Sequence, residues 1–205
     1  LGVLYSLRSS GTASHSASCI IDVGGGSTEV IITPRDADPV IVSLPLGAVY
    51  LTERFLIHDP PTEEELSRMR AVIREGLNSA FRDAPHAFSG LFIGTAGTVT
   101  TLASIKLGLE VYDPAQINGC ELTSGDIDEM TMHLSRLTRQ ERTSVRGLEP
   151  GREDIILAGA VVVQEIMERC RRASLLVSDG GLQEGIVIDL FNRETGGNDS
   201  REPHQ

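Results

Sequence analysis

The stretch CIIDVGGGSTEVIIT, residues 19–33, decides the fold. Residues 19–23 are apolar apart from Asp22 and stop at three consecutive glycines, and residues 28–33 are again β-branched and apolar. Two such runs joined by a glycine turn predict a β-hairpin. Another apolar run, residues 40–44, follows the turn-rich stretch PRDADP. We therefore expect three strands that form a meander.

Beyond the meander the pattern changes to helices. Thr62 with Glu65 three residues later matches a capping box, and the Pro60-Pro61 pair before it blocks an earlier start. Apolar residues then recur at helical spacing to about residue 83. The other expected elements are strands at 91–93 and 174–179 and helices at 98–107, 124–137, 139–145, 155–167 and 182–191. The expected order is β-β-β-α-α-β-α-α-α-α-β-α, in which the first of the two helices after the meander has no predicted bounds.

This order is typical of a mixed α/β domain whose sheet begins as an antiparallel meander and then gains parallel strands flanked by helices. Residues 1–18 are interpreted as a linker because residues 8–18 are small and polar. Residues 19–192 form the predicted domain, and the polar residues 193–205 a disordered tail.

The composition excludes several classes of protein. A formal net charge of −11 disfavours non-specific binding to nucleic acid or to an anionic membrane. The chain shows no signal-peptide pattern and no apolar run approaching the roughly 20 residues of a membrane span, so a cytoplasmic protein is expected. Cys19, Cys120 and Cys170 are scattered, which favours reduced thiols over disulfides or a zinc site.

The glycine turn carries the first chemical signal. The backbone N–H groups of Gly24, Gly25 and Gly26 can point at one anion with no side chain in the way, and the hydroxyls of Ser27 and Thr28 add donors. Asp22 and Glu29 flank the turn, where they can hold Mg²⁺ or orient a water molecule. The alternative is an ordinary hairpin with two solvated acids.

A second small-residue loop, Gly94-Thr95-Ala96-Gly97-Thr98, lies between an apolar strand and a helix. Helix N-termini attract phosphate through unpaired N–H groups and the helix dipole, although a tight connection with a threonine cap gives the same pattern. Glycine turns follow strands near residues 24, 94 and 180, and we expect them on one face. Arg152 is a further candidate phosphate contact, unless it pairs with Asp154 or a neighbour.

Five blocks, in order and at matching spacing, resemble the second domain of Ppx/GppA phosphatases. They are DVGGGSTE, PLGAVYLTERFLIHDPPTEEEL, GTAGTVTTLA, ERTSVRGLEPGREDIILAGA and SDGGLQEGI. The resemblance spans about residues 19–190. It implies a ribonuclease-H-like fold of the actin-like ATPase superfamily.

The resemblance also implies an activity: hydrolysis of the terminal phosphoanhydride of polyphosphate, or of the γ-phosphate of guanosine pentaphosphate, with Mg²⁺. Asp22 and Glu29 take the places of the family's catalytic and metal-binding acids, and Gly24–Gly26 with Ser27 those of its phosphate-binding residues. The family's first domain, which carries a second phosphate loop and another catalytic glutamate, is expected upstream. The chain alone is therefore expected to be inactive, and the full-length protein to be a dimer.

Two positions depart from the family pattern: Gln183 stands where many members have arginine, and Ala96 where glycine or serine is frequent. Two other functions stay open at this point. One is a phosphotransferase of the same superfamily. The other is a non-catalytic module that binds guanosine tetraphosphate or pentaphosphate.

Overall fold

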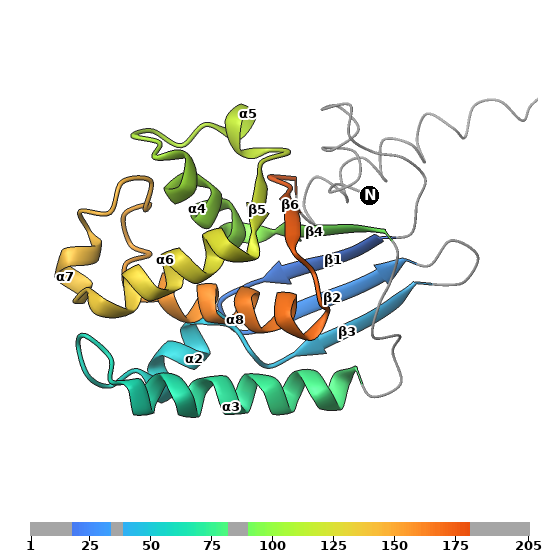
Figure 1. Ribbon diagram of the computed structural model, residues 1–205, viewed down its shortest axis with the longest axis horizontal. Helices are drawn as coiled ribbons and strands as arrows, with labels where there is room; N and C mark the ends of the chain where they lie inside the picture. The colour runs from blue at the N-terminus through green and yellow to red at the C-terminus, as the bar shows by residue number, and fades with distance from the viewer. Residues whose placement is uncertain (1–17, 34–38, 82–89, 181–205) are drawn as a thin grey trace, which may run out of the picture.

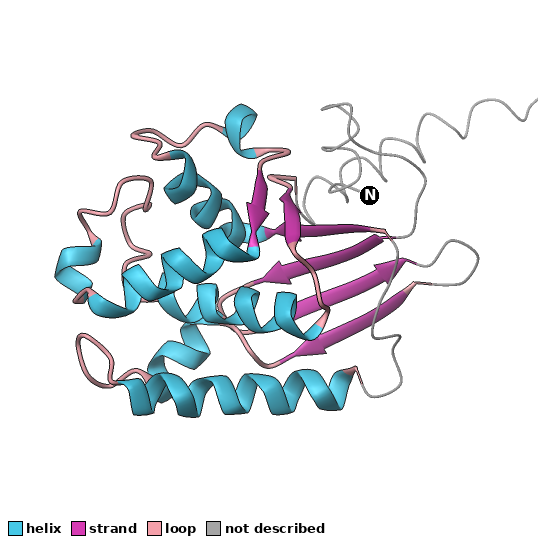
Figure 2. Cartoon of the chain, in the orientation of Figure 1, coloured by secondary structure: helices cyan, strands magenta, loops and turns pink. Residues whose placement is uncertain are grey.

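The computed structural model describes residues 18–33, 39–81 and 90–180, which fold into a six-stranded sheet with helices (Figures 1 and 2). The strand order is β3-β2-β1-β4-β6-β5. The strands are β1 (Ser18–Val23), β2 (Thr28–Thr33), β3 (Val40–Leu44), β4 (Leu91–Thr95), β5 (Glu121–Thr123) and β6 (Ser174–Val177).

The predicted mixed sheet is confirmed. β1, β2 and β3 pair antiparallel as a meander, whereas β4 runs parallel to β1 and β6 runs parallel to β4. β5 pairs antiparallel with β6 at the far edge. Ile21 and Val23 of β1 belong to the main core, and the alternate residue Ile20 forms a small second cluster with Ile93. The alternation follows from the two-residue period of a strand.

The helices are α2 (Ala48–Phe55), α3 (Glu63–Ala80), α4 (Ala96–Leu107), α5 (Pro114–Ile117), α6 (Ser124–Arg136), α7 (Arg139–Arg142) and α8 (Ile156–Arg169). The central helix is α8, which packs against α2, α3, α4 and α6 (Figure 1). Residues 156–163 are all buried, in line with the prediction of a buried helix. A Cβ atom on Gly159 would lie 2.5 Å from Cγ2 of Thr98, so this glycine permits close contact between α8 and α4.

The predicted capping box of α3 is present. Thr62 Oγ1 accepts from the Glu65 N–H at 3.3 Å, and Glu65 Oε2 accepts from the Thr62 N–H at 2.8 Å. The same carboxylate also accepts from the backbone N–H groups of Ile57 and His58, at 3.0 and 3.2 Å. Glu65 is therefore buried at the centre of the loop that leads into α3.

The structure corrects several boundaries. The stretch 108–123, predicted to lack regular structure, contains α5 and β5, and α2 is the helix whose bounds were not predicted. Ser18, predicted to end the linker, begins β1. α4 starts two residues earlier than predicted, and α7 ends at Arg142 instead of residue 145.

Several predictions concern residues outside the described part of the chain. They are the helix 182–191, which includes Gln183, residues 1–17 of the linker, and the tail 193–205. Within the described part of the chain, no helix has the length and apolar character needed to cross a membrane. Cys19, Cys120 and Cys170 are free thiols, and burial raises the pKa of Cys19 to about 12.

Candidate functional site

The two glycine loops emerge from the same edge of the sheet. β1 and β4 are parallel neighbours, with Asp22 paired to Thr95, so the chain leaves both strands at the same level. β6 is parallel to β4, which brings Ser178 to the same edge, where its N–H donates to Gly94 O at 2.9 Å. This carboxyl edge is where ligands bind in open α/β sheets.

The turn after β1 is fixed against the start of α2. The Gly24 N–H donates to Ser27 O at 3.0 Å and closes the turn. The carbonyls of Gly24 and Gly25 accept from the N–H groups of Ala48 and Val49, each at 2.9 Å. The first N–H groups of α2 are therefore satisfied by the turn, and the Gly24 N–H is not available to a ligand, contrary to the simplest expectation for three consecutive glycines.

The remaining glycines leave an open side. Within the described residues, the N–H groups of Gly25 and Gly26 make no hydrogen bond, and both glycines are exposed. A Cβ atom on Gly26 would meet no atom within 4 Å. Gly47, which the sequence analysis did not single out, is more restricted, because its Cβ would lie 2.1 Å from Gly25 O. Only glycine at position 47 allows α2 to approach the turn this closely.

Asp22 and Glu29 lie opposite each other across β1 and β2. Burial raises the pKa of the Asp22 carboxyl, and the nearby charge of Glu29 raises it further. Glu29 Oε1 accepts hydrogen bonds from Ser27 Oγ at 2.7 Å and from Ser43 Oγ at 2.8 Å. These two hydroxyls fix the orientation of the Glu29 carboxylate.

Ser43 was missed in the sequence, although it is the register partner of Glu29 in β3 and a polar residue of the predicted meander. Ser27 was expected to donate to phosphate. In the structure its hydroxyl donates to Glu29 instead, so its contribution to the site includes holding the carboxylate.

Three threonines expected at the site have side chains that are committed to the fold. Thr28 Oγ1 donates to Leu46 O at 2.8 Å, and Thr95 Oγ1 donates to Gly180 O at 3.1 Å. Thr98 is buried against Gly159 of α8. The Thr28 and Thr95 hydroxyls therefore stabilise the loops and Thr98 packs against α8, so the groups left to face a ligand are mainly backbone N–H groups.

The start of α4 forms the second half of the site. Thr95 is its N-cap residue but makes no side-chain capping bond. Ala96 has φ +68°, in the left-handed region that favours glycine, which explains why glycine suits this position. A Cβ on Gly97 would lie 2.2 Å from a guanidinium nitrogen of Arg152, so Arg152 lies directly over this turn of the loop.

Arg152 pairs with Glu149, Nε to Oε2 at 3.3 Å, so the alternative of an ion pair with a neighbouring acid is present, with Glu149 in place of Asp154. Glu149 in turn accepts from Thr101 Oγ1 of α4 at 3.3 Å. The side chain of Arg152 is 31% exposed, and its guanidinium group lies beside Gly97. The structure thus places this candidate phosphate contact next to the second loop.

Tyr112 and Asp179 form a further polar contact that the sequence did not suggest. The Tyr112 hydroxyl donates to Asp179, which follows β6 at the carboxyl edge. Burial and then this hydrogen bond raise the pKa of Tyr112 to about 12. The pair comes from segments 67 residues apart, so no local pattern could have indicated it.

Asp22 and Glu29 are suitable ligands for Mg²⁺, which prefers hard oxygen donors and is commonly bound by one or two carboxylates together with substrate phosphates and water. Within residues 18–33, 39–81 and 90–180, no group of three or more His, Cys, Asp or Glu side chains could hold a metal ion. The two carboxylates therefore fit a site that the substrate and further ligands complete.

The chain is similar to several characterised and solved proteins. It is 35% identical over 175 residues to exopolyphosphatase 2 of Mycobacterium tuberculosis, covering 83% of this chain and 54% of that relative. It is 30% identical to a bifunctional 3-dehydroquinate synthase/phosphatase of Fusobacterium nucleatum, covering 83% of this chain and 26% of the relative. The chain thus spans about half the length of the first relative and about a quarter of the second.

Solved structures agree with the sequence comparison. A Ppx/GppA family member from Aquifex aeolicus superimposes with a TM-score of 0.83 at 34% identity, over 94% of this chain and 60% of that chain. The solved Ppx/GppA structures similar to this chain have the ribonuclease-H-like fold of the actin-like ATPases, which confirms the predicted fold class. The model of the Ppx/GppA phosphatase family matches residues 3–194, and the chain belongs to this family.

Proposed function

We propose that this chain forms one side of the catalytic cleft of a hydrolase that removes the terminal phosphate from inorganic polyphosphate or guanosine pentaphosphate. The observation that carries the proposal is the meeting of the Gly25–Gly26 N–H groups, the Asp22 and Glu29 carboxylates and the start of α4 at one edge of the sheet. Phosphoryl transfer needs this combination of positioning and charge stabilisation.

The terminal phosphate binds between the two loops. The free N–H groups of Gly25 and Gly26 donate to its oxygens from one side, and the first N–H groups of α4 face it from the other. Arg152, held over Gly97, contributes a positive charge beside the same loop. These donors stabilise negative charge as it develops on the phosphoryl oxygens.

Glu29 orients the attacking water. Ser27 and Ser43 occupy its Oε1, and within the described residues no hydrogen bond reaches Oε2. Oε2 is therefore the oxygen that accepts from water and aims it at phosphorus. Asp22 and Glu29 also hold Mg²⁺, which when bound neutralises charge on the phosphate oxygens.

A second domain of the parent protein completes the cleft in this proposal. The matched part makes up only 54% of the Mycobacterium tuberculosis relative and 60% of the Aquifex aeolicus chain, which supports a partner domain in the same protein. That domain supplies the remaining catalytic groups, and the full-length protein functions as a dimer in the cytoplasm.

A second function is favoured by the small number of acidic ligands at the site. Among the described residues only Asp22 and Glu29 flank the turn, and no cluster of three metal-binding side chains is found in that part of the chain. With so few ligands, this chain by itself is better suited to bind a phosphorylated nucleotide than to hydrolyse it.

The test is phosphate release from polyphosphate and from guanosine pentaphosphate, measured side by side on a longer protein that contains this chain, with and without Mg²⁺. Magnesium-dependent release from either substrate supports the hydrolase and shows the preferred substrate. Binding without release favours the nucleotide-binding module. Transfer of phosphate to an added acceptor, instead of to water, indicates a phosphotransferase.

A further inference from the structure

A cavity rich in arginine lies on the helical side of the molecule, among α3, the start of α6 and the end of α8. Its volume is about 550 Å³, within the range of about 300–1,000 Å³ that small-molecule sites occupy. The lining residues that carry charge or hydrogen-bonding groups used below are Arg70, Arg74, Arg171, Arg172, Asp128, Glu168 and Gln164. None of them belongs to the two glycine loops.

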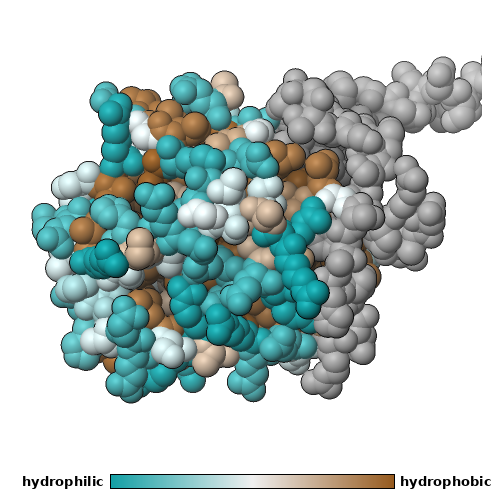
Figure 3. Space-filling view, in the orientation of Figure 1, coloured by the Kyte–Doolittle hydropathy of each residue, from teal (hydrophilic) through white to brown (hydrophobic). Residues whose placement is uncertain are grey.

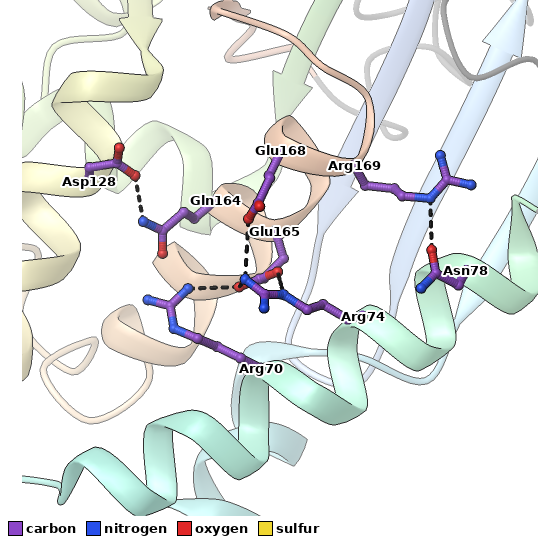
Figure 4. A network of polar contacts seen from close by, with 8 residues as sticks. All are labelled: Arg70, Arg74, Asn78, Asp128, Gln164, Glu165, Glu168 and Arg169. Carbon is purple, nitrogen blue, oxygen red and sulfur yellow. Dashed lines mark hydrogen bonds and ion pairs between the residues drawn. The ribbon is translucent and has the colours of Figure 1, made fainter.

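The cavity has an excess of positive charge on a strongly acidic chain. Four arginines line it against two carboxylates, whereas the chain as a whole has a net charge of −11. Arg70 and Arg74 are partly neutralised by the buried Glu165, at 2.8 and 2.5 Å (Figure 4). Even with Glu165 counted, one positive charge remains, so the cavity attracts anions.

Three of the four cavity arginines, Arg70, Arg74 and Arg172, are held in place by the fold. Glu165 accepts from Arg70 Nη1 and from Arg74 Nε, which ties α3 to α8, and Glu168 lies 3.3 Å from Arg74 (Figure 4). Arg172 donates to Gly90 O, so its side chain is also fixed. A set of arginines ordered before binding loses little conformational entropy when a phosphate arrives.

Arg171 provides a positive charge that no carboxylate of the described residues neutralises in an ion pair. It is exposed, and within the described residues it makes no ion pair. Its φ of +51° is unusual for a residue other than glycine. It belongs to the turn that ends α8, in which the Arg171 N–H donates to Glu168 O at 3.1 Å and the Arg172 N–H donates to Met167 O at 2.9 Å; a left-handed residue is common at this place.

Gln164 of α8 adds a hydrogen-bond acceptor to the lining of the cavity. Gln164 Nε2 donates to Asp128 Oδ1 at 2.5 Å, which leaves the amide oxygen for other partners (Figure 4). Gln164 Oε1 is buried and has no hydrogen-bond partner among the described residues. A buried acceptor without a donor is costly, and a hydroxyl group on a ligand satisfies it.

We propose that this cavity binds a small phosphorylated molecule that carries hydroxyl groups, such as a sugar phosphate or the ribose phosphate part of a nucleotide. The phosphate pairs with Arg171 and its neighbouring arginines, and a hydroxyl donates to Gln164 Oε1. The face that carries α3 and α8 is largely covered by hydrophilic side chains, as expected around a site for a polar ligand (Figure 3). The site does not depend on the proposed function of the glycine loops.

Isothermal titration calorimetry of the 205-residue chain with ribose 5-phosphate, and separately with pyrophosphate, tests the proposal. Arg171→Ala is expected to weaken the binding of ribose 5-phosphate by roughly tenfold or more, because a charge-assisted hydrogen bond is lost, and to weaken to the same degree the pyrophosphate binding that persists in Gly26→Ala. Gln164→Leu is expected to weaken only the binding of ribose 5-phosphate, since pyrophosphate lacks the hydroxyl. Arg68→Ala is the matched control, because Arg68 is an exposed arginine of α3 that does not line the cavity.

Ribose 5-phosphate binding that survives Arg171→Ala but is lost in Gly26→Ala places this ligand at the glycine loops and overturns the proposal. Absence of binding at millimolar ribose 5-phosphate overturns it as well. If Arg171→Ala is unfolded, Arg171→Gly gives the same test, since glycine readily adopts the left-handed backbone found here.

Discussion

At the scale of single residues, Glu29 is the side chain on which the proposed chemistry most directly depends. Its carboxylate is oriented by Ser27 and Ser43 and lies at the rim of the turn. Glu29→Gln keeps the size and most hydrogen-bonding capacity but removes the charge. In a longer protein with activity, we expect kcat to fall about 10²–10⁴-fold, as is typical for loss of a general base.

The folding stability of the same variant is expected to change by no more than about 0.5 kcal/mol, because Glu29 makes no buried ion pair. Thermal melts measured beside kcat separate the two effects. Ser43→Ala is a useful comparison, since it keeps the carboxylate and removes one of its two orienting bonds, and a smaller loss of rate is expected. Near-normal kcat in Glu29→Gln would remove this residue from the mechanism.

Gly26 and Gly47 lie close together, but substitution of the two residues is expected to have different effects. A side chain on Gly26 meets no atom within 4 Å, whereas one on Gly47 lies 2.1 Å from a backbone oxygen. Gly26→Ala should therefore leave the melting temperature nearly unchanged and reduce phosphate binding. Gly47→Ala should destabilise the fold by about 2–3 kcal/mol, since backbone must move. Equal melting temperatures for the two variants would contradict this assignment.

Ala96 is a residue at which substitution is expected to stabilise the protein. Its φ of +68° is unfavourable for any residue with a Cβ atom. The left-handed backbone costs about 1–2 kcal/mol, part of which glycine loses again through its more flexible unfolded state. We expect Ala96→Gly to gain about 1 kcal/mol, or roughly 2–4 °C in melting temperature. A lower melting temperature would show that this backbone conformation is not populated.

At the scale of elements, the start of α3 depends on a carboxylate that must stay ionised. Burial raises the pKa of Glu65, but hydrogen bonds from His58 and from the backbone of Thr62, Ile57 and His58 outweigh it and lower the pKa to about 2. Since the folded-state pKa lies below the ordinary 4.5, the stabilisation is present above pH 4.5 and is lost as the pH falls toward 2.

Melting curves of the parent chain and Glu65→Gln between pH 7 and pH 3 check this expectation. The parent should lose more stability on acidification than the variant, and the two curves should approach each other at low pH. Glu64→Gln, an exposed change in the same first turn, is the matched control and should follow the parent. Parallel curves for the parent and Glu65→Gln would contradict the assignment.

Local patterns predicted the long elements well. The capping box at Thr62, the apolar periodicity of α3 and the apolar run of α8 each lie within one segment, and the structure has all of them. β5 has three residues and α5 has four, too few for a periodicity to be visible. α2 has eight residues and depends on tertiary contact, since its first N–H groups bond to the glycine turn.

The difference between local patterns and contacts between distant segments also applies to the site. Asp22, Glu29 and the glycine loops are recognisable because their residue types and spacing carry the chemistry. Ser43, Gly47 and Glu149 act through partners in other segments, so only the folded chain brings them to the site. The fold also commits the Thr28 hydroxyl to Leu46, which no local pattern could reveal.

At the scale of the whole molecule, the sheet presents donors and carboxylates along a single edge. β1, β4 and β6 run parallel and end together there. Their loops approach a ligand from one side, and full enclosure of a transferring phosphate requires groups on the other side as well. The chain covers 54% of its relative from Mycobacterium tuberculosis, and the function proposed above assigns those groups to a further domain.

This geometry predicts that the isolated 205-residue chain has negligible phosphatase activity. Water stays in contact with the exposed Gly25 and Gly26, so the electrostatic interactions of the site remain screened, and two carboxylates are too few to fix both metal and nucleophile. Phosphate release from polyphosphate by the chain alone, measured with Mg²⁺, should therefore not exceed that of its Glu29→Gln variant. Binding of tripolyphosphate should still be measurable, because the Gly25 and Gly26 N–H groups need no partner domain to be in place. Rapid magnesium-dependent turnover that Glu29→Gln abolishes would show instead that one side of the cleft is sufficient for catalysis.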